Sequence, residues 1–439
     1  CCTLAKKTVT LQPLITENMS ANIKRILFSC ILFCVSSMLM AQISINSPYS
    51  RYGYGLLSDQ AFGNSIGMGG TAIGMRSRFH INPVNPASYT AVDSITFMFD
   101  LGMSIQNSNF VEGPVKTNAK NASFDYVAMQ FRFSAGYIPF SNVGYDMSKK
   151  TTVTSNEYGD ETYSLATYKG EGGLQQLYVG LAYKVLPNLS VGANASLLYG
   201  DISHTVSTQF SNAAASISAH GHQISASDLK FDLGAQYTHT LADRKELTLG
   251  LIYGLGSDLG NTEGYNFTHS VNTVSTAVSE QVDTIRNAFQ LPATIGVGLA
   301  YTYNNQLTVG LDVKHQNWSS AKYFGEEDYF NNRTRVSLGA EYQPDVYGRK
   351  FFGRIRYRLG GHYTKSYTKT ADGSNVNEYG ASFGFGIPLF LYNSRTYLNL
   401  SGEYVHVQPK LSGLLEENYL RINIGITFNE RWFMKWKVE

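Results

Sequence analysis

The chain has 439 residues with 35 basic and 33 acidic side chains, 41 glycines, 13% aromatic residues and 15% charged residues. A chain so close to neutral lacks the basic surface of a nucleic-acid-binding protein, so we expect no nucleic-acid partner. Low charge combined with many glycines and aromatic residues is typical of a protein made of strands and turns with aromatic belts.

The first 41 residues have the composition of a targeting segment. Residues 1–18 precede Met19 and read as sequence upstream of the true start. Lys24 and Arg25 are followed by an apolar run and then by the small residue Ala41, so residues 19–41 are predicted to be a secretory signal peptide. The alternative is a membrane anchor, but the apolar run is short for a span of about 20 residues.

All four cysteines, Cys1, Cys2, Cys30 and Cys34, lie in this segment. The predicted mature chain therefore has no disulfide, thiolate metal site or cysteine nucleophile. It carries 31 basic and 32 acidic side chains, because the removed segment holds four of the basic residues and one of the acidic ones. The nine histidines show no metal-ligand spacing, so we expect no metal and no cofactor.

From Ile95 onward, apolar and polar residues alternate along the chain. Strand side chains point alternately to two faces, so each such segment has one apolar face and one small, polar face. The predicted strands are 95–106, 124–133, 134–147, 177–184, 189–199, 229–237, 247–255, 295–303, 307–313, 336–342, 355–363, 379–387, 398–404, 419–428 and 432–438.

These strands predict an all-β protein, a transmembrane antiparallel β-barrel. Single-chain bacterial barrels have even strand numbers, so we expect about fourteen strands. The strand Tyr419–Phe428 should pair with the first strand, because only closure removes sheet edges in lipid. Short turns such as 187–188 and 304–306 should lie on one rim, and long polar connections on the other. Those connections are 205–226, 264–284 and 366–377.

Residues 42–91 differ from the rest of the chain and precede the barrel, 92–439. They are rich in glycine and proline, which favour turns over strands, so we expect a compact hatch in the barrel lumen. Its marker residues are Gly67, Gly69, Gly70, Asn82, Pro83, Asn85 and Pro86. Residues 63–67 match the G-x-S-x-G pattern of hydrolases, but a glycine-rich turn explains them better than a nucleophile, and we expect no enzyme.

Arg354, Arg356 and Arg358 are spaced by two residues in a predicted strand. An arginine facing lipid near the membrane centre costs about 2–4 kcal/mol, so we expect all three in the lumen. They should pair with acidic groups of the hatch or neighbouring strands. The alternative is a direct role in binding an anionic group.

The alternation fails near Tyr137, Ile138, Pro139 and Phe140. Proline cannot donate to a strand ladder and is confined to edges, strand starts and bulges. These residues could therefore line a lateral opening in the wall that leads into the bilayer. An ordinary bulge or a strand end near the rim explains the same pattern.

Two stretches resemble the FadL/TodX family of outer-membrane transport proteins for hydrophobic compounds. They are Gly67-Met68-Gly69-Gly70-Thr71-Ala72 and Asn82-Pro83-Val84-Asn85-Pro86-Ala87, which precede the first strand. In that family such stretches belong to a hatch that plugs a fourteen-stranded barrel, and Phe140 and Tyr145 fall where the family has a kinked third strand. Ser47 to Gly53 looks like a divergent branch of the family.

The resemblance implies a function and a set of partners. We expect an outer-membrane channel of a Gram-negative bacterium for hydrophobic small molecules, such as long-chain fatty acids. The barrel should be a monomer surrounded by outer-membrane lipid and lipopolysaccharide. The alternative is a secretion-associated or structural barrel that binds protein partners at its long loops. The motifs identify no ligand-pocket residue.

Overall fold

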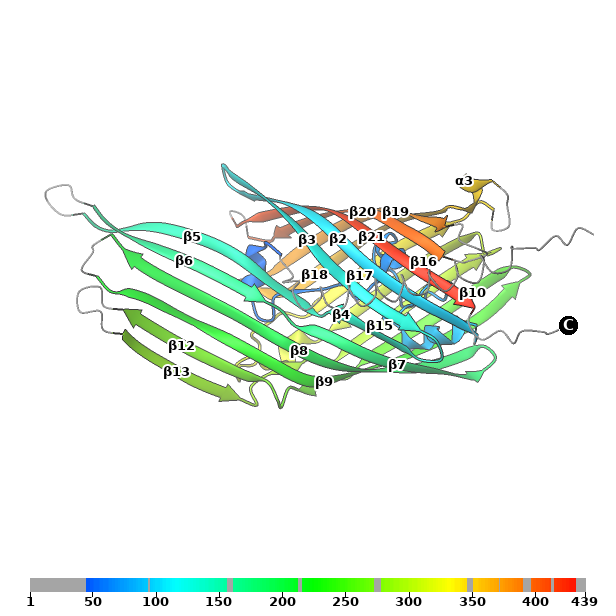
Figure 1. Cartoon of the computed structure of the whole chain (residues 1–439), viewed down its shortest axis with the longest axis horizontal. Helices are drawn as coiled ribbons and strands as arrows, with labels where there is room; N and C mark the ends of the chain where they lie inside the picture. The colour runs from blue at the N-terminus through cyan, green and yellow to red at the C-terminus, as the bar shows by residue number, and fades with distance from the viewer. Residues whose placement is uncertain are drawn as a thin grey trace, which may run out of the picture. The chain divides into compact units, whose positions relative to one another are not determined.

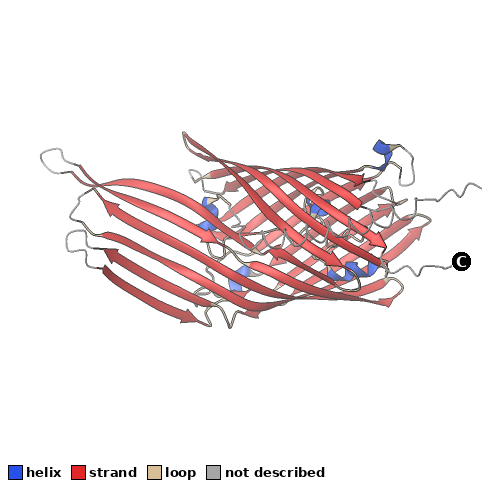
Figure 2. Cartoon of the chain, in the orientation of Figure 1, coloured by secondary structure: helices blue, strands red, loops and turns tan. Residues whose placement is uncertain are grey.

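The computed structural model describes residues 45–93, 95–155, 161–211, 215–271, 278–345, 350–370, 372–389, 396–411 and 414–431. The predicted upstream segment, the signal peptide and the predicted strand 432–438 lie outside these residues. Strands dominate the described chain, and the helical segments are single short turns (Figure 2).

Fourteen of the described strands form one closed antiparallel ring, as the sequence pattern predicts. In ring order they are β2 (Thr96–Glu112), β3 (Val115–Gln130), β4 (Ser134–Pro139), β7 (Gln175–Leu186), β8 (Leu189–Phe210), β9 (Ile217–Ala242), β10 (Lys245–Gly254), β15 (Thr294–Tyr303), β16 (Leu307–Gln316), β17 (Arg333–Tyr342), β18 (Arg356–Lys369), β19 (Asn375–Leu389), β20 (Thr396–Pro409) and β21 (Glu416–Arg431).

The ring closes between its first and last strands. β2 and β21 pair continuously from Thr96 with Arg431 to Val111 with Glu416. The predicted closure by the C-terminal strand is therefore confirmed. Pairing of these two strands removes the sheet edges that would otherwise face lipid.

The two faces of the wall separate polar from apolar side chains. On β7, Leu177, Val179 and Leu181 are exposed on the outside, and other strands repeat this apolar belt. The inward residues of β2, among them Asp100, Ser104 and Gln106, are buried. The alternation sends every second side chain outward into an apolar belt, which is the arrangement that a membrane-spanning barrel requires. Among the described residues, no helix is long and apolar enough to cross a membrane.

One rim carries the short turns, at 187–188, 243–244 and 304–306. Asn304 and Asn305 both have positive φ, which suits a tight turn. On the opposite rim, the expected long polar loops are largely wrong. Residues 205–226, 264–284 and 366–377 lie mostly in strands, because polar strands continue to pair above the apolar belt. β9 has 26 residues, although about 9–11 suffice to cross a bilayer.

We call the strand layer above the belt on this side the wing. It consists of β5 (Ser141–Ser155), β6 (Glu161–Gly172), β12 (Glu263–Val271), β13 (Val278–Arg286) and residues 200–226 of β8 and β9. β5 and β6 run with β8 and apart from β2 and β3 (Figure 1). β11 (Ser257–Asp258) and β14 (Gln290–Leu291) pair with each other separately.

The hatch, residues 45–91 in the described chain, lies inside the ring (Figure 1). It contains η1 (Pro48–Arg51), β1 (Leu56–Leu57), α2 (Gly63–Ile66) and η2 (Pro86–Ala91). Two further short helical segments, η3 (Trp318–Ser320) and α3 (Phe351–Arg354), lie in connections between wall strands. Ser65 of the G-x-S-x-G pattern is buried in α2, a single helical turn inside the barrel.

Candidate functional site

The wall is interrupted between β3 and β5. β3 and β4 pair only from Val127 with Tyr137 to Gln130 with Ser134. β4 ends at Pro139, and β5, which follows Phe140, forms ladders with β6 and β1. In the described part of the chain, no ladder joins residues 115–126 of β3 to β5. A gap in strand pairing therefore opens beside β3 (Figure 1).

The predicted lateral-opening residues lie at the lower end of this gap. Tyr137 pairs with Val127, and its hydroxyl donates to Gln175 at 2.7 Å. Ile138 and Phe140 are buried, and Pro139 is the last residue of β4. A break at this position agrees with proline's missing donor. That the break serves as an exit stays a prediction.

Neighbouring strands bend at the same level. The amide nitrogen of Phe140 donates to the carbonyl oxygen of Leu174 at 2.8 Å, and Gly173 donates to Asp201 at 2.9 Å. Gly173 and Gly200 have positive φ, and a Cβ on either would overlap a backbone oxygen of the adjacent strand. Only glycine permits such an approach. The strand ends at Pro139 and Gly173 therefore lie beside Gly200 of the continuous strand β8, and the wing leaves the barrel wall as one layer at this level.

The first part of the hatch occupies the gap. Leu56 and Leu57 pair with Asn142 and Ser141 of β5 as an added short strand. The amide nitrogen of Ser47 donates to Gly144 at 2.9 Å. Toward the other side, the side-chain amides of Asn46 and Asn121 lie 3.0 Å apart. Residues 45–58 thus bridge β3 and β5 where the two strands do not pair.

The second part of the hatch lies on a row of glycines that we call the glycine track. A Cβ on any of them would come closer to hatch atoms than real Cβ contacts normally allow. The track provides one glycine from each of eight successive wall strands, so hatch backbone approaches the wall closely. Its described members are Gly192, Gly234, Gly250, Gly298, Gly310, Gly339, Gly360 and Gly384.

Four of the predicted hatch markers, Gly67, Gly69, Asn85 and Pro86, meet this track. Gly67 faces Gly384, Gly69 lies against Gly360 and Gly361, and Pro86 lies against Gly192 and Gly234. Gly69 and Gly70 have positive φ. Asn82 donates to Ala72 at 2.7 Å, Asn85 donates to Ile73 at 2.8 Å, and the carbonyl oxygen of Pro83 accepts from Asn194 at 2.9 Å. These contacts hold the hatch turns in a fixed shape.

A wall carboxylate anchors the centre of the hatch. Asp312 of β16 accepts hydrogen bonds from the amide nitrogens of Ala72 and Ile73, at 2.6 and 2.7 Å. Charge-assisted hydrogen bonds of this kind are stronger than neutral ones. Sequence reasoning missed Asp312 and the glycine track. The signal was the repeated glycine at inward positions, which we took only as a mark of a small, polar lumen face.

The predicted arginine row is wrong at one position. Arg356 and Arg358 face the lumen and bind the same carboxylate, Glu341, at 2.8 and 2.7 Å. Arg354 instead lies at the end of α3, because β18 begins only at Arg356. The ion pair with the hatch is made by an arginine outside this row, Arg335 of β17. Arg335 binds Asp59 at 2.8 Å and donates to the carbonyl oxygen of Gly69 at 3.2 Å.

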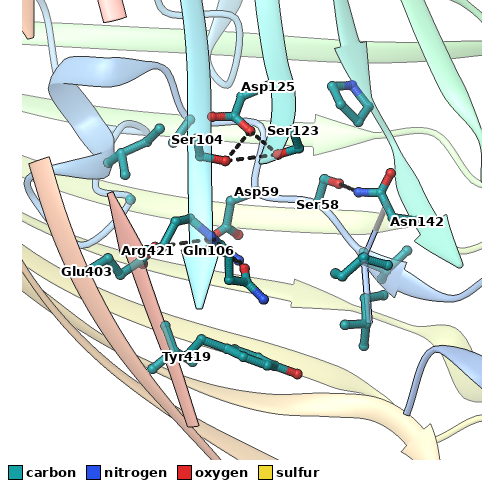
Figure 3. Close-up of a pocket in the computed structure, with 18 of the residues that line it drawn as sticks. Ser58, Asp59, Ser104, Gln106, Ser123, Asp125, Asn142, Glu403, Tyr419 and Arg421 are labelled. Carbon is teal, nitrogen blue, oxygen red and sulfur yellow. Dashed lines mark hydrogen bonds and ion pairs between the residues drawn. The ribbon is translucent and has the colours of Figure 1, made fainter. Parts of the chain in front are cut away.

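A cavity of about 180 Å³ lies between the hatch and the wall, next to the gap. Most side chains at its wall are polar or charged, and they come from β2, β3, β17, β18, β19, β20 and β21 (Figure 3). The charged ones are Asp59, Asp125, Arg333, Arg335, Glu378, Glu403 and Arg421. Such a lining can bind polar groups and can form hydrogen bonds with the hatch.

The largest apolar cluster is filled by its own aromatic side chains. Tyr54 of the hatch packs against Trp318, Tyr323 and Phe330, with ring centroids 5.3–6.1 Å apart. The hydroxyl of Tyr367 donates to the hatch carbonyl oxygen of Gly55. This cluster therefore closes the lumen above the hatch with packed rings.

Two histidines lie at the edge of this cluster, above the apolar belt. The ring centroids of His204 and His222 are 4.7 Å apart, and the hydroxyl of Tyr145 lies 2.8 Å from His204 Nδ1. The outward residue Asp201 at this level is exposed and polar, so the pair lies beyond the membrane-spanning part. Burial lowers the pKa of His204 to about 3 and also lowers the pKa of His222. Both imidazoles are therefore neutral at physiological pH.

Comparison with known protein families shows the family to which this chain belongs. The BamG family model matches residues 22–439. The chain belongs to the BamG family. A search of the curated proteins found no match. In the described residues, no cluster of three or more histidine, cysteine, aspartate or glutamate side chains could hold a metal ion.

Solved structures share the fold of this BamG-family chain at low identity. The deltaS2S3 mutant of the TodX monoaromatic hydrocarbon channel is 16% identical, with a TM-score of 0.54, over 84% of this chain and 99% of that one. The Ralstonia pickettii toluene transporter TbuX is 16% identical, with a TM-score of 0.52, over 85% and 99%. A Pseudomonas aeruginosa FadL homologue is 13% identical, with a TM-score of 0.50, over 86% and 98%. The predicted FadL/TodX resemblance is confirmed for the fold.

Proposed function

We propose that this protein is an outer-membrane channel that passes hydrophobic small molecules through the gap between β3 and β5. The observation that carries the proposal is that gap. Its lower end, at Val127 and Tyr137, lies level with the outward apolar residue Leu177 of the belt, and in the described chain hatch residues 45–58 bridge it. The hatch joins β5 through the two-residue strand β1 and a few further hydrogen bonds, and it contacts β3 through side chains, so it can move without breaking the barrel.

A lateral route is physically favourable for such a solute. Moving from an apolar site into water costs about 25 cal/mol per Å² of apolar surface. An exit through the wall leads into the bilayer and avoids this step. The neighbours TodX and TbuX, named as a hydrocarbon channel and a toluene transporter, support the substrate class by analogy of fold alone.

The proposal is tested by locking the hatch to β3. Asn46 and Asn121 touch across the gap, so Asn46→Cys with Asn121→Cys should form a disulfide there. Uptake of a hydrophobic fluorescent probe into liposomes should stop on oxidation and return with reductant. The matched control is Asn109→Cys with Asn118→Cys, another contacting asparagine pair, which lies directly opposite in the ladder between β2 and β3, on the side of β3 that does not face the gap. Equal uptake by the oxidised locked variant and the oxidised control would exclude this route.

A second candidate function is binding of a protein partner at the wing. In the described residues β13 has a ladder only with β12, so its other edge is unpaired. Nearly all its side chains are exposed. An open edge can accept a strand from another chain. Val282→Pro should abolish recovery of a stoichiometric partner from gently solubilised membranes and leave probe uptake unchanged, whereas the locked hatch should do the opposite.

A further inference from the structure

A β-bulge turns one carboxylate of β3 into the lumen. β2 and β3 are in register at Gly102 with Tyr126 and at Met103 with Phe124, so Asp125 is an extra residue without a partner in the ladder. Tyr126 is a buried inward residue, and simple alternation would put Asp125 on the lipid side. Instead its carboxylate accepts from Ser104 and Ser123, at 2.8 and 2.9 Å. Bulges often redirect a side chain next to a functional site.

The bulge lies at the gap. The ladder between β3 and β4 begins at Val127, two residues beyond Asp125, so Asp125 lies in the part of β3 that β4 does not pair with. Asp125 lines the cavity together with Ser123 and Phe124. Figure 3 shows its carboxylate beside Ser104 and Ser123, apart from Arg421. On the lipid side, the rings of Phe124 and Tyr137 lie 6.2 Å apart. A polar cavity and an apolar surface thus meet at this point of the wall.

Asp125 is also the carboxylate that the cavity's arginines leave unpaired. Asp59 binds Arg333 and Arg335, Glu378 binds Arg335, and Glu403 binds Arg421. Within the described lining, three arginines therefore face four carboxylates, and no ion pair includes Asp125. His362 contacts Glu378 and Glu403 but does not line the cavity. The cavity then has one negative charge in excess, at the gap.

Further polar atoms at the cavity lack partners. Asp125 Oδ2 and Asn142 Oδ1 are buried acceptors without a hydrogen-bond donor, and Asn423 Nδ2 is a buried donor without an acceptor. Asn423 is only 4% exposed, and all three residues line the cavity. Buried polar groups are normally paired, so unpaired ones in a cavity point to a ligand. The set has two acceptors, one of them charged, and one donor.

We propose that this cavity binds the cationic ammonium head group of an amphiphile whose apolar chain lies in the gap. Asp125 and Asn142 accept from the ammonium group, and Phe124 and Tyr137 contact the chain. A volume of about 180 Å³ equals roughly six water molecules at ~30 Å³ each, which suits an aminoalkyl group. Such an amphiphile would be the ligand of the proposed channel. Only its entry through the gap between β3 and β5 rests on the proposed function.

Titration calorimetry of the full mature chain in an uncharged detergent at pH 8 tests the site. Octylammonium, octanol and octanoate share one chain length and differ in head-group charge. Octylammonium should bind at least tenfold more tightly than the other two, since one charge-assisted hydrogen bond is enough for that factor. Equal or tighter binding of octanoate would overturn the proposal. Ethylammonium should bind at least tenfold more weakly, and equal binding would show a site for free amines instead of amphiphiles.

Variants connect the binding to Asp125. Asp125→Asn should weaken octylammonium binding at least tenfold and leave octanol binding unchanged, whereas Asp125→Glu should keep octylammonium affinity within threefold. The control Glu171→Gln removes an exposed carboxylate of β6 outside the cavity and should change nothing. Folding is checked by faster gel migration of unheated than of boiled protein. An unchanged affinity in folded Asp125→Asn would reject the site.

The outcome separates this inference from the proposed channel. Octylammonium can bind most tightly and lose affinity in Asp125→Asn, while oxidation of the locked hatch leaves uptake unchanged. That result would support the head-group site and exclude the lateral route. If locking stops uptake and octylammonium shows no preference, the route stands and the head-group site falls.

Discussion

Two regions of the barrel wall differ in how their strands pair. One region runs from β15 through β21 to β2, and the other runs from β3 to β8. In the first region each strand pairs along its length with both neighbours, and glycines on β15 to β19 receive the hatch backbone. In the second region strands break at Pro139 and Gly173, β8 continues through the positive-φ residue Gly200, and the upper parts leave as the wing. Regular pairing gives a rigid seat for the hatch, and the breaks give a gap that part of the hatch fills.

This contrast divides the hatch itself. Residues 67–87 contact the glycine track and Asp312 at many points, most of them through backbone atoms that cannot move aside as a flexible side chain can. Residues 45–58 contact the strands beside the gap through a two-residue strand, a few separate backbone hydrogen bonds and side chains. Local stability follows the density of such contacts, so the second part should open more easily than the first. The following predictions test that division, from the largest effect to the smallest.

Deleting residues 45–91 removes both parts of the hatch and should have the largest effect. The ring closes through strands outside this segment, so the barrel should still form. The expected result is a conducting pore in planar bilayers, where the intact protein is nearly silent. Intact and deleted proteins with equal conductance would mean that the hatch does not fill the lumen.

Gly360→Val should unseat the rigid part of the hatch. The new side chain would overlap the backbone of Met68 and Gly69, which cannot move away as a flexible side chain can. Overpacking of a core costs about 1–3 kcal/mol or more. We expect a clear drop in the temperature at which the unheated gel form is lost, together with raised conductance. Gly260→Val is the control, since a Cβ there meets nothing within 4 Å.

Asp312→Ala should loosen the hatch locally, at residues 71–75, instead of unseating it. It leaves the amide nitrogens of Ala72 and Ile73 buried without an acceptor, at about 1–3 kcal/mol for each group. Hydrogen exchange should rise at residues 71–75 and stay constant at residues 45–58. Asp243→Asn, in an exposed turn, is the control. A uniform rise along the whole hatch would show that its two parts open as one unit.

Low pH should destabilise the aromatic cluster around Trp318, Tyr323 and Phe330, which lies above the hatch. The folded pKa of His204 is about 3, below the usual 6.5, so the unfolded chain binds more protons between these values. Stability is therefore present above about pH 6.5 and is lost as pH falls, by about 2 kcal/mol at pH 5. Exchange at residues 318–330, corrected for the intrinsic rate, should rise at pH 5. His204→Gln should remove this rise, whereas His239→Gln, at an exposed site, should keep it.

The sequence alone determined the class of fold. Side chains alternate with a period of two in any strand, so outward Leu177, Val179 and Leu181 and inward polar residues followed directly from the pattern. Pairing of the last strand with the first followed because lipid tolerates no sheet edge. Gly69, Pro83 and Pro86 marked residues 42–91 as a turn-rich segment, because glycine and proline favour turns over strands.

Tertiary structure decided what depends on partners distant in sequence. The alternation in β3 could not show that Asp125 is a bulge, because a bulge exists only relative to β2. Arg354 shared the spacing of Arg356 and Arg358, but the start of pairing with β17 and β19 excluded it from the wall. The glycine track, Asp312 and the gap beside β3 likewise arise where separate segments meet. Local sequence sets the face of a strand, and only the closed ring decides which atoms face each other across it.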